Sequence, residues 1–176
     1  FWRLVYEKGV HLLIEALNNL ESRNWVFLID AFSRYKTDYQ KEIERLIDQS
    51  NFKDKTFFFE ANHTEIAAYM NASDIAVLPS IPTKKWVEQY GRIVPEALSC
   101  GNLLIISDKG AQNQFFINSY SNVFTQPDTK SLSHILDENI EVIKNSSYDR
   151  IGNSLRAKKL YSLEAQLLVF LSALSR

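Results

Sequence analysis

Two glutamates eight positions apart flank a glycine in the run EQYGRIVPE, from Glu88 to Glu96. Gly91 lets the backbone approach a ligand closely, and Pro95 is tolerated only in a first helical turn, so a helix should begin near Arg92. Free amides at a helix start bind phosphate, whereas glutamates accept hydrogen bonds from the paired hydroxyls of ribose or hexose rings. The run therefore predicts a nucleotide-sugar site; the alternative is a solvated loop acid followed by an ordinary first-turn acid.

A second cluster places two cations, Arg3 and Lys8, in the segment RLVYEKG, which leads into a helical pattern. Two cations on one side and helix amides on the other would clamp a diphosphate, and would stabilise the charge that grows on it as a leaving group. The alternative is that both are surface charges flanking a strand end. We expect them to lie in the same crevice as the glutamates.

Short runs of β-branched or aromatic residues alternate with segments of helical periodicity, which is typical of parallel strands joined by crossover helices. We expect an α/β fold, a Rossmann-like three-layer sandwich with a six-stranded parallel sheet of order 3-2-1-4-5-6. Ligands of such sheets bind beyond the carboxyl ends of the strands, where the strand order reverses. The expected strands are Phe1–Val5, Trp25–Asp30, Thr56–Glu60, Ile75–Pro79, Leu103–Ser107 and Asn122–Thr125.

Apolar stripes at helical spacing predict helices that cover this sheet. The stripes are Val10, Leu13, Ile14 and Leu17, then Ile43, Leu46 and Ile47, and later Leu132, Ile135, Leu136 and Ile140. The tail from Tyr148 to Arg176 predicts one or two further helices outside the sheet. Its candidates for burial are Ile151, Leu155, Leu160, Leu163, Leu167 and Phe170.

The composition limits the classes of partner and the compartment. Twenty basic and twenty-one acidic side chains leave a net charge of -1, which favours neither nucleic acid nor an anionic membrane as a partner. The single cysteine, Cys100, excludes an internal disulfide framework, and a free thiol fits a reducing cytoplasm. We therefore expect a cytoplasmic protein.

The ends and the longest apolar run bear on domain organisation. The chain opens on Phe1 without an initiator methionine, and we expect a single domain over residues 1–176 that begins within a larger fold. The run Leu167 to Leu174 is far shorter than the roughly 20 residues of a membrane-spanning helix. Contact with a membrane, peripheral and at its inner face, is expected only through a domain that this chain lacks.

The motifs together resemble the C-terminal domain of retaining GT-B glycosyltransferases of the glycogen-synthase-like, group 1 family. The resemblance runs from Arg3 to about Gln114: EQYGRIVPE matches the family's two glutamates separated by seven residues, and ALSCG follows it. The segment Ala72 to Ser80 is also similar to the family. The likeness implies transfer of a sugar from a nucleoside diphosphate, UDP or GDP, with retention of anomeric configuration.

The resemblance also assigns roles to residues. Glu88, Arg3 and Lys8 would be catalytic, with Glu88 on the donor sugar and the two cations on the diphosphate. Glu96 would hold the ribose, and a further set would contact the donor through the backbone. That set is Tyr90, Gly91, Arg92, Ile93 and Val94 at the phosphates, and Gly110 in the loop after the fifth expected strand.

Neither a cofactor nor a metal is expected, because the family neutralises the diphosphate with cationic side chains. His11, His63 and His134 are scattered without ligand spacing, and none of them is assigned to a metal or to catalysis. The expected partners are the nucleotide-sugar donor and the protein's own N-terminal domain, which would hold the acceptor. Alone, the donor half should bind nucleotide and transfer little.

Some residues differ from the family pattern. Trp2 stands where a glycine is usual, Asp30 begins a turn that lacks the usual glycines, and Gln114 replaces an acid. The loop from Pro82 to Val87 is longer than is common; it could contact the donor, the acceptor or the partner domain, or form plain surface. These differences favour a second hypothesis, a non-catalytic sugar-nucleotide-binding module.

Two further classes of protein share the architecture. A nucleotide-sugar epimerase or a phosphorylase is less consistent with this glutamate spacing beside an arginine–lysine loop. A dinucleotide-dependent oxidoreductase is less consistent still, because the chain lacks the Gly-x-Gly-x-x-Gly motif.

Overall fold

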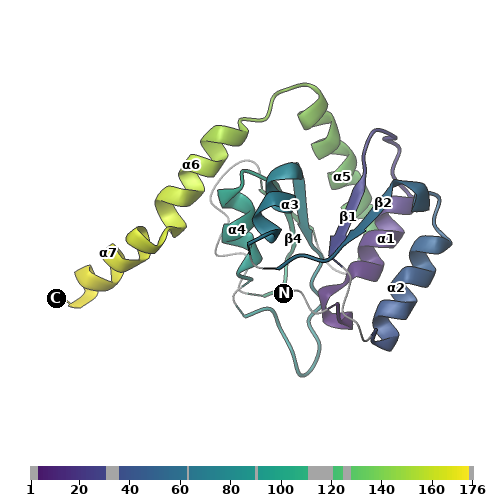
Figure 1. Cartoon of the computed structure of the whole chain (residues 1–176), viewed down its shortest axis with the longest axis horizontal. Helices are drawn as coiled ribbons and strands as arrows, with labels where there is room; N and C mark the ends of the chain where they lie inside the picture. Colours follow the sequence, from purple (N-terminus) through teal and green to yellow (C-terminus); the bar gives the residue numbers. More distant parts are fainter. Residues whose placement is uncertain are drawn as a thin grey trace.

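Short strands and helices alternate along the chain in a computed structural model that describes residues 4–30, 36–62, 64–89, 91–110, 121–124 and 128–174 (Figure 1). The strands are β1 (Phe27–Asp30), β2 (Thr56–Phe59), β3 (Ile75–Leu78), β4 (Leu103–Ser107) and β5 (Ser121–Phe124). The α-helices are α1 (Val10–Asn18), α2 (Asp38–Asp48), α3 (Ile66–Ala72), α4 (Ile93–Ser99), α5 (Thr129–Lys144), α6 (Arg150–Tyr161) and α7 (Leu163–Leu174). Two 3-10 turns complete the described elements, η1 (Tyr6–Lys8) and η2 (Lys53–Lys55).

The described strands form two parallel sheets, β1-β2 and β3-β4-β5. Each neighbour in them was expected from the order 3-2-1-4-5-6, and no end of these five strands differs from the expected one by more than two residues. The first expected strand is the exception. Leu4 and Val5 lie outside any strand, and the rest of Phe1–Val5 lies outside the described residues. The α/β class is confirmed, whereas the six-strand order stays a prediction.

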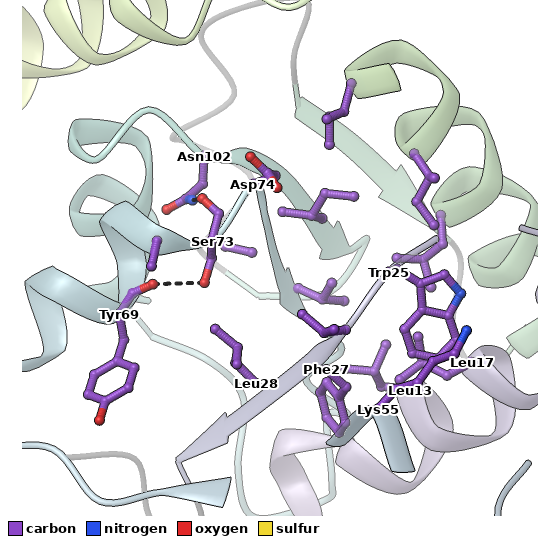
Figure 2. A pocket seen from close by; sticks show the side chains of 18 of the residues that line it. Leu13, Leu17, Trp25, Phe27, Leu28, Lys55, Tyr69, Ser73, Asp74 and Asn102 are labelled. Atoms are coloured by element: carbon purple, nitrogen blue, oxygen red, sulfur yellow. Dashed lines mark hydrogen bonds between the residues drawn. The ribbon is translucent and has the colours of Figure 1, made fainter. Parts of the chain in front are cut away.

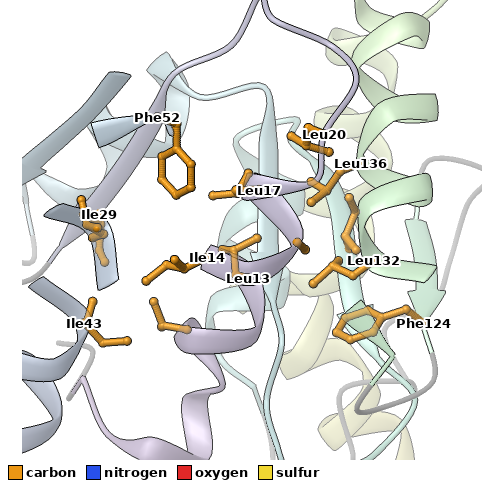
Figure 3. Packing of buried hydrophobic residues seen from close by; sticks show 14 of the residues in the cluster. Leu13, Ile14, Leu17, Leu20, Ile29, Ile43, Phe52, Phe124, Leu132 and Leu136 are labelled. Carbon is orange, nitrogen blue, oxygen red and sulfur yellow. The ribbon is translucent and has the colours of Figure 1, made fainter. Parts of the chain in front are cut away.

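One face of the sheets is covered by α1, α2 and α5, and the largest core lies there (Figure 3). The three predicted apolar stripes supply it, because their spacing puts each stripe on one side of its helix. Ile14, Ile43 and Leu132 are almost fully buried in this core, together with Phe52 and Phe124. The capping box of Thr37 and Gln40 fixes the start of α2.

The opposite face of β3 and β4 is covered by α4 and α6. Side chains alternate along β4: Ile105 belongs to the first core, whereas Leu104 and Ile106 pack with Val94 and Leu98 of α4. All five residues of β4 are buried, as expected for a strand with helices on both sides. The three layers of the predicted sandwich are therefore present.

The burial expected of the C-terminal leucines is wrong. Figure 1 shows α6 and α7 leading away from the body, and the exposed fractions of Ile151 and Leu163 are 75% and 79%. The helix α6 instead packs on α4 through small or polar residues, Asn153 and Ala157, which are both fully buried. The Asn153 amide donates to the carbonyl of Asn102 at 3.0 Å, so a polar contact fixes the register of α6. Leu155, Leu160 and Leu167 are likewise exposed, and the side chain of Phe170 lies outside the described set.

A cavity of about 810 Å³ lies between the two sheets, and we call it the inter-sheet cavity (Figure 2). Leu28 of β1 and Val77 of β3 face it from opposite sides, and α1 closes one end with Leu13 and Leu17. In the predicted strand order this is the place of the first strand.

Candidate functional site

The segment before α1 and the loop after β3 lie against each other. The backbone amide of Ile81 donates to the carbonyl of Glu7 at 2.7 Å. Gly9 has φ +66, and a Cβ atom at this position would lie 1.9 Å from the carbonyl oxygen of Pro79. Only glycine allows both the left-handed backbone and this close approach. The sequence KG therefore brings Lys8 to the carboxyl end of β3, where the predicted site lies.

Lys8 and Glu88, 80 positions apart in the chain, form an ion pair, which we call the Lys8–Glu88 site. The Nζ atom of Lys8 lies 2.6 Å from Oε2 of Glu88, and the side chains are 21% and 13% exposed. The second carboxylate oxygen of Glu88 accepts from the backbone amide of Gly91 at 3.3 Å. Glu88 thus contacts two of the groups that were expected to bind phosphate.

Gly110 reaches the same site from the loop after β4. A Cβ atom on Gly110 would lie 2.8 Å from the carbonyl oxygen of Glu88, and φ is +98. The neighbouring Asp108 and Lys109 form an ion pair of 2.9 Å. Segments that contain Lys8, Gly91 and Gly110 therefore meet at Glu88, and the roles predicted for these residues stay predictions.

The helix expected to begin near Arg92 does so, because Arg92 is the N-cap of α4 and Pro95 lies in its first turn. Glu96 is exposed on this helix, and no contact among the described residues joins its carboxylate to Lys8 or Glu88. The Val94 amide donates to the carbonyl of Gly91 at 2.8 Å, so a phosphate at this turn would compete with that bond. Ile93 faces the inter-sheet cavity.

Two predicted site residues, Arg3 and Tyr90, lie outside the described residues. The roles expected of them therefore stay predictions. So do the contacts expected of the turn after Asp30 and of the loop beyond Gly110, because residues 31–35 and 111–120 are also outside the described part.

Trp86 is a site residue whose contact the sequence left open. The Lys8 ammonium lies 5.1 Å from the centroid of its ring, within cation–π range. Ser80 was also missed: it is 2% exposed, and its hydroxyl oxygen has no hydrogen-bond partner among the described residues. Neither could be found from spacing, because both depend on the course of the loop after β3.

Two carboxylates follow the other sheet, at the ends of β1 and β2. Burial raises the pKa of Asp30, and the nearby Glu60 carboxylate adds to that rise. Phe59 stacks on Tyr69 at 3.8 Å between ring centroids, close to this edge. The Glu60 carboxylate thus acts on Asp30 by repulsion, whereas Glu88 is paired with a cation.

Other titratable groups belong to the packing of the protein. Nδ1 of His11 and the hydroxyl of Tyr39 are hydrogen-bonded at 2.7 Å; burial lowers the pKa of His11 and raises the pKa of Tyr39 to about 12. Burial also raises the pKa of Cys100. Among the described residues, His, Cys, Asp and Glu form no group of three that could hold a metal ion. The same residues include no helix that is long and apolar enough to cross a membrane.

Comparison with protein families gives a match over nearly the whole chain. The family described as glycosyl transferases group 1 matches residues 2–158. A glycogen synthase of Mycobacterium tuberculosis is 32% identical over 130 residues, which are 71% of this chain and 29% of that protein. An uncharacterized glycosyltransferase of Methanocaldococcus jannaschii is 25% identical over 126 residues, 71% of this chain and 30% of that protein. The chain thus spans about a third of the length of these relatives.

Solved structures share the fold. The Anabaena protein HepE in complex with UDP has a TM-score of 0.79 at 21% identity, over 98% of this chain and 47% of that one. A glycosyltransferase from Rickettsia africae has a TM-score of 0.81 at 19% identity, over 98% and 45%. At these identities the likeness establishes the fold alone.

Proposed function

Since this chain belongs to the group 1 glycosyl transferases, we propose that it is the donor-binding half of a retaining glycosyltransferase. It would bind a nucleoside-diphosphate sugar, while the acceptor is held by another domain of a longer protein. The observation that carries the proposal is the meeting of Lys8, Glu88, Gly91 and Gly110 at the carboxyl ends of β3 and β4. HepE, which shares the fold, has been solved with UDP and with UDP-glucose.

Each group of the site has a chemical task in this reaction. Lys8, together with Arg3, would take the diphosphate and offset the charge that develops on it as the glycosyl bond breaks. No metal is needed for this step if the two cations supply the charge. Glu88 would accept hydrogen bonds from the sugar hydroxyls, and Glu96 from the ribose. Retention of configuration is proposed from the spacing of these two glutamates in the family motif.

The ion pair implies an exchange of partners when the donor binds. In the free protein, the Glu88 carboxylate contacts Lys8 and the amide of Gly91, which are the groups expected to hold phosphate. A diphosphate carries charge of the same sign as this carboxylate and would compete with it for both donors. Glu88 would then accept hydrogen bonds from the hydroxyls of the sugar, which would replace Lys8 as its partner.

Calorimetric titration of the protein with UDP, GDP and ADP tests the proposal directly. One of the three should bind at low salt, and Arg3→Ala should weaken that binding, because each cation makes a charge-assisted contact with the phosphates. Failure of all three to bind would overturn the proposed function. Sugar transfer is then measured with the full-length protein, and absence of transfer despite binding would favour the non-catalytic module.

Glu88→Gln separates the two roles of this side chain. A neutral amide competes less well for Lys8, so the free nucleoside diphosphate should bind the variant more tightly, by about 3- to 10-fold for a bond worth about 1 kcal/mol. The sugar-bearing donor should gain less than the free diphosphate, since it loses a charged acceptor for its hydroxyls. Equal changes in affinity for the free diphosphate and for the sugar-bearing donor would show that Glu88 does not contact the sugar.

Glu96→Gln tests the ribose contact. The loss of a hydrogen bond to a charged acceptor should weaken nucleotide binding by about 1 to 3 kcal/mol. The same change should have no effect on 2',3'-dideoxynucleoside diphosphates, which lack the hydroxyls. An equal loss for the ribonucleoside and the dideoxynucleoside diphosphates would show that Glu96, which is exposed on α4, does not contact the ribose.

A further inference from the structure

The loop between β3 and α4 carries Trp86, whose backbone is held by hydrogen bonds within the loop. Thr83 and Trp86 pair through two backbone hydrogen bonds, of 2.8 Å from the Thr83 amide and 3.4 Å from the Trp86 amide. The loop is also joined to the segment of Lys8 by the bond from Ile81 to Glu7. These backbone contacts bring the Trp86 backbone close to the segment of Lys8, and the ring lies 5.1 Å from the Lys8 ammonium group.

Among the contacts of Lys8, those with Glu88 and Trp86 differ in kind. Its ammonium group lies 2.6 Å from the Glu88 carboxylate and 5.1 Å from the centroid of the Trp86 ring. The lysine side chain is only 21% exposed, so solvent screens these contacts less than on an open surface. Lysine has a flexible four-carbon stem, and its ammonium group stays in place only while its partners hold it.

The two contacts respond differently to a diphosphate. Glu88 carries the same charge as the ligand and must give up Lys8 when phosphate binds. The indole is neutral and approaches the ammonium group through the ring face, so it can keep its contact while phosphate oxygens bind the same group. Tryptophan offers the best face of the aromatic side chains for this purpose.

We propose that Trp86 is a positioning residue for Lys8, which its ring holds at the site while the donor diphosphate replaces Glu88 as the ionic partner. This inference rests on the proposed function. Trp86 itself needs no contact with the nucleotide. The exposed Lys84 and Lys85 at the tip of the same loop have no part in it.

The test compares Trp86→Leu and Trp86→Phe with the wild type. The probe is whichever of UDP, GDP and ADP binds the wild type most tightly, titrated calorimetrically at low salt. Trp86→Leu should lose about 2- to 30-fold in affinity, the equivalent of a cation–π contact of about 0.5–2 kcal/mol. Trp86→Phe should keep most of the affinity, because it preserves a ring face. Thermal unfolding of each variant shows that it is folded at the temperature of the titration.

A double-mutant cycle distinguishes positioning from a general effect on the loop. In a Lys8→Ala background, Trp86→Leu should cause no further loss, because the group that it positions is gone. Trp25 provides the matched control, since its ring lies 5.1 Å from the ammonium group of Lys55 in the other half of the molecule. Trp25→Leu removes the same kind of contact and should leave the affinity unchanged.

The outcomes separate this inference from the proposed function. If the wild type binds a nucleoside diphosphate and Trp86→Leu binds it equally well, Trp86 has no positioning role and the proposed function stands. Equal losses with and without Lys8, or a loss as large in Trp25→Leu, would also overturn the role. If no nucleoside diphosphate binds the wild type, both proposals fail.

Discussion

The Lys8–Glu88 site and the inter-sheet cavity differ in what converges on them. The inter-sheet cavity is large, about 810 Å³, and some of its polar groups bond to protein: the Ser73 hydroxyl donates to the carbonyl of Tyr69 (Figure 2), and the side-chain amide of Asn102 donates to the carbonyl of Ser73. The side-chain oxygen of Asn102 is buried without a hydrogen-bond partner among the described residues. The Lys8–Glu88 site joins a cation, a carboxylate and two close backbone segments from three loops. The cavity and the convergence of charged side chains are therefore found at different places in the described part of the protein.

The difference follows from how strands end. Apolar side chains of the strands and of the helices that pack on them, such as Leu28, Leu13 and Ile140, line much of the cavity. The loops at the carboxyl ends carry polar side chains, and the parallel order brings the loops after β3 and β4 together. We therefore expect ligand binding to depend on the Lys8–Glu88 site, and changes at the inter-sheet cavity to affect stability alone.

The largest effect is expected for Gly9→Ala, which would disrupt the close approach of Gly9 to the backbone of Pro79 beside the Lys8–Glu88 site. A Cβ atom would lie 1.9 Å from the backbone oxygen of Pro79, and the residue would have to keep a left-handed φ. We expect a loss of about 3 kcal/mol or more in the free energy of unfolding, measured by urea denaturation.

Gly152→Ala is the matched control for that experiment. The added Cβ atom would also lie 1.9 Å from its neighbour, but this neighbour is the end of the Asp149 side chain, which can move. Because Gly152 lies within α6, alanine also has the better helix propensity. Equal destabilisation by both changes would show that the contact of Gly9 has no special role.

The next effect compares two lysines. Lys8→Ala should weaken binding of the preferred nucleoside diphosphate by about 10- to 100-fold, the range for losing a charge-assisted hydrogen bond. Lys55 lies at the inter-sheet cavity and also contacts a tryptophan ring, so Lys55→Ala should leave the affinity unchanged. A comparable loss of affinity in Lys55→Ala would indicate that the nucleotide binds at the inter-sheet cavity.

A smaller effect is expected for Leu28→Ala at the wall of the inter-sheet cavity. The side chain is half-buried and borders empty space, so its removal should lower the free energy of unfolding by about 1 kcal/mol, less than a core leucine would. Nucleotide affinity, measured on the same samples by calorimetry, should not change. A change in affinity without a change in stability would contradict the comparison.

The smallest effect concerns pH, at the end of β1. Burial raises the pKa of Asp30 above its ordinary 3.8, so folding disfavours the ionised carboxylate. Stability should therefore fall as the pH rises from about 4 through the pKa of the folded state. Asp30→Asn should not show this fall, because asparagine does not ionise. The melting temperature of Asp30→Asn should exceed that of the wild type at pH 7, and the gap should close near pH 3. A constant gap would show that ionisation is not its cause.

Much of the fold could be predicted because it depends on local spacing. The stripe of Val10, Leu13 and Leu17 is one face of α1, and the burial of β4 follows from its unbroken apolar run. The tail is different: its leucines suggested burial, yet α6 packs through Asn153 and Ala157. Hydrophobicity predicts that a side chain prefers burial, but not which surface will cover it.

The candidate site was predictable in its charged members and not in its contacts. The sequence predicted Lys8 and Glu88 in one crevice, because Lys8 was expected after the first strand and Glu88 follows the strand β3. The ion pair between them is seen only in the structure. Trp86 and Ser80 could not, because their places depend on the backbone path of the loop after β3, and no periodic pattern fixes that path. The contact between Gly9 and Pro79 is likewise visible only in three dimensions.

The exposed leucines of α7 affect the solubility of the protein. Leu167, Leu168 and Leu171 are half-exposed or more, and Glu164 is the helix's single charged residue. A helix with few polar side chains and exposed leucines presents apolar surface to water, and such surface favours association between molecules. We expect samples of this chain to be prone to aggregation as the concentration rises, so binding measurements belong in dilute solution, with light scattering as a check on particle size.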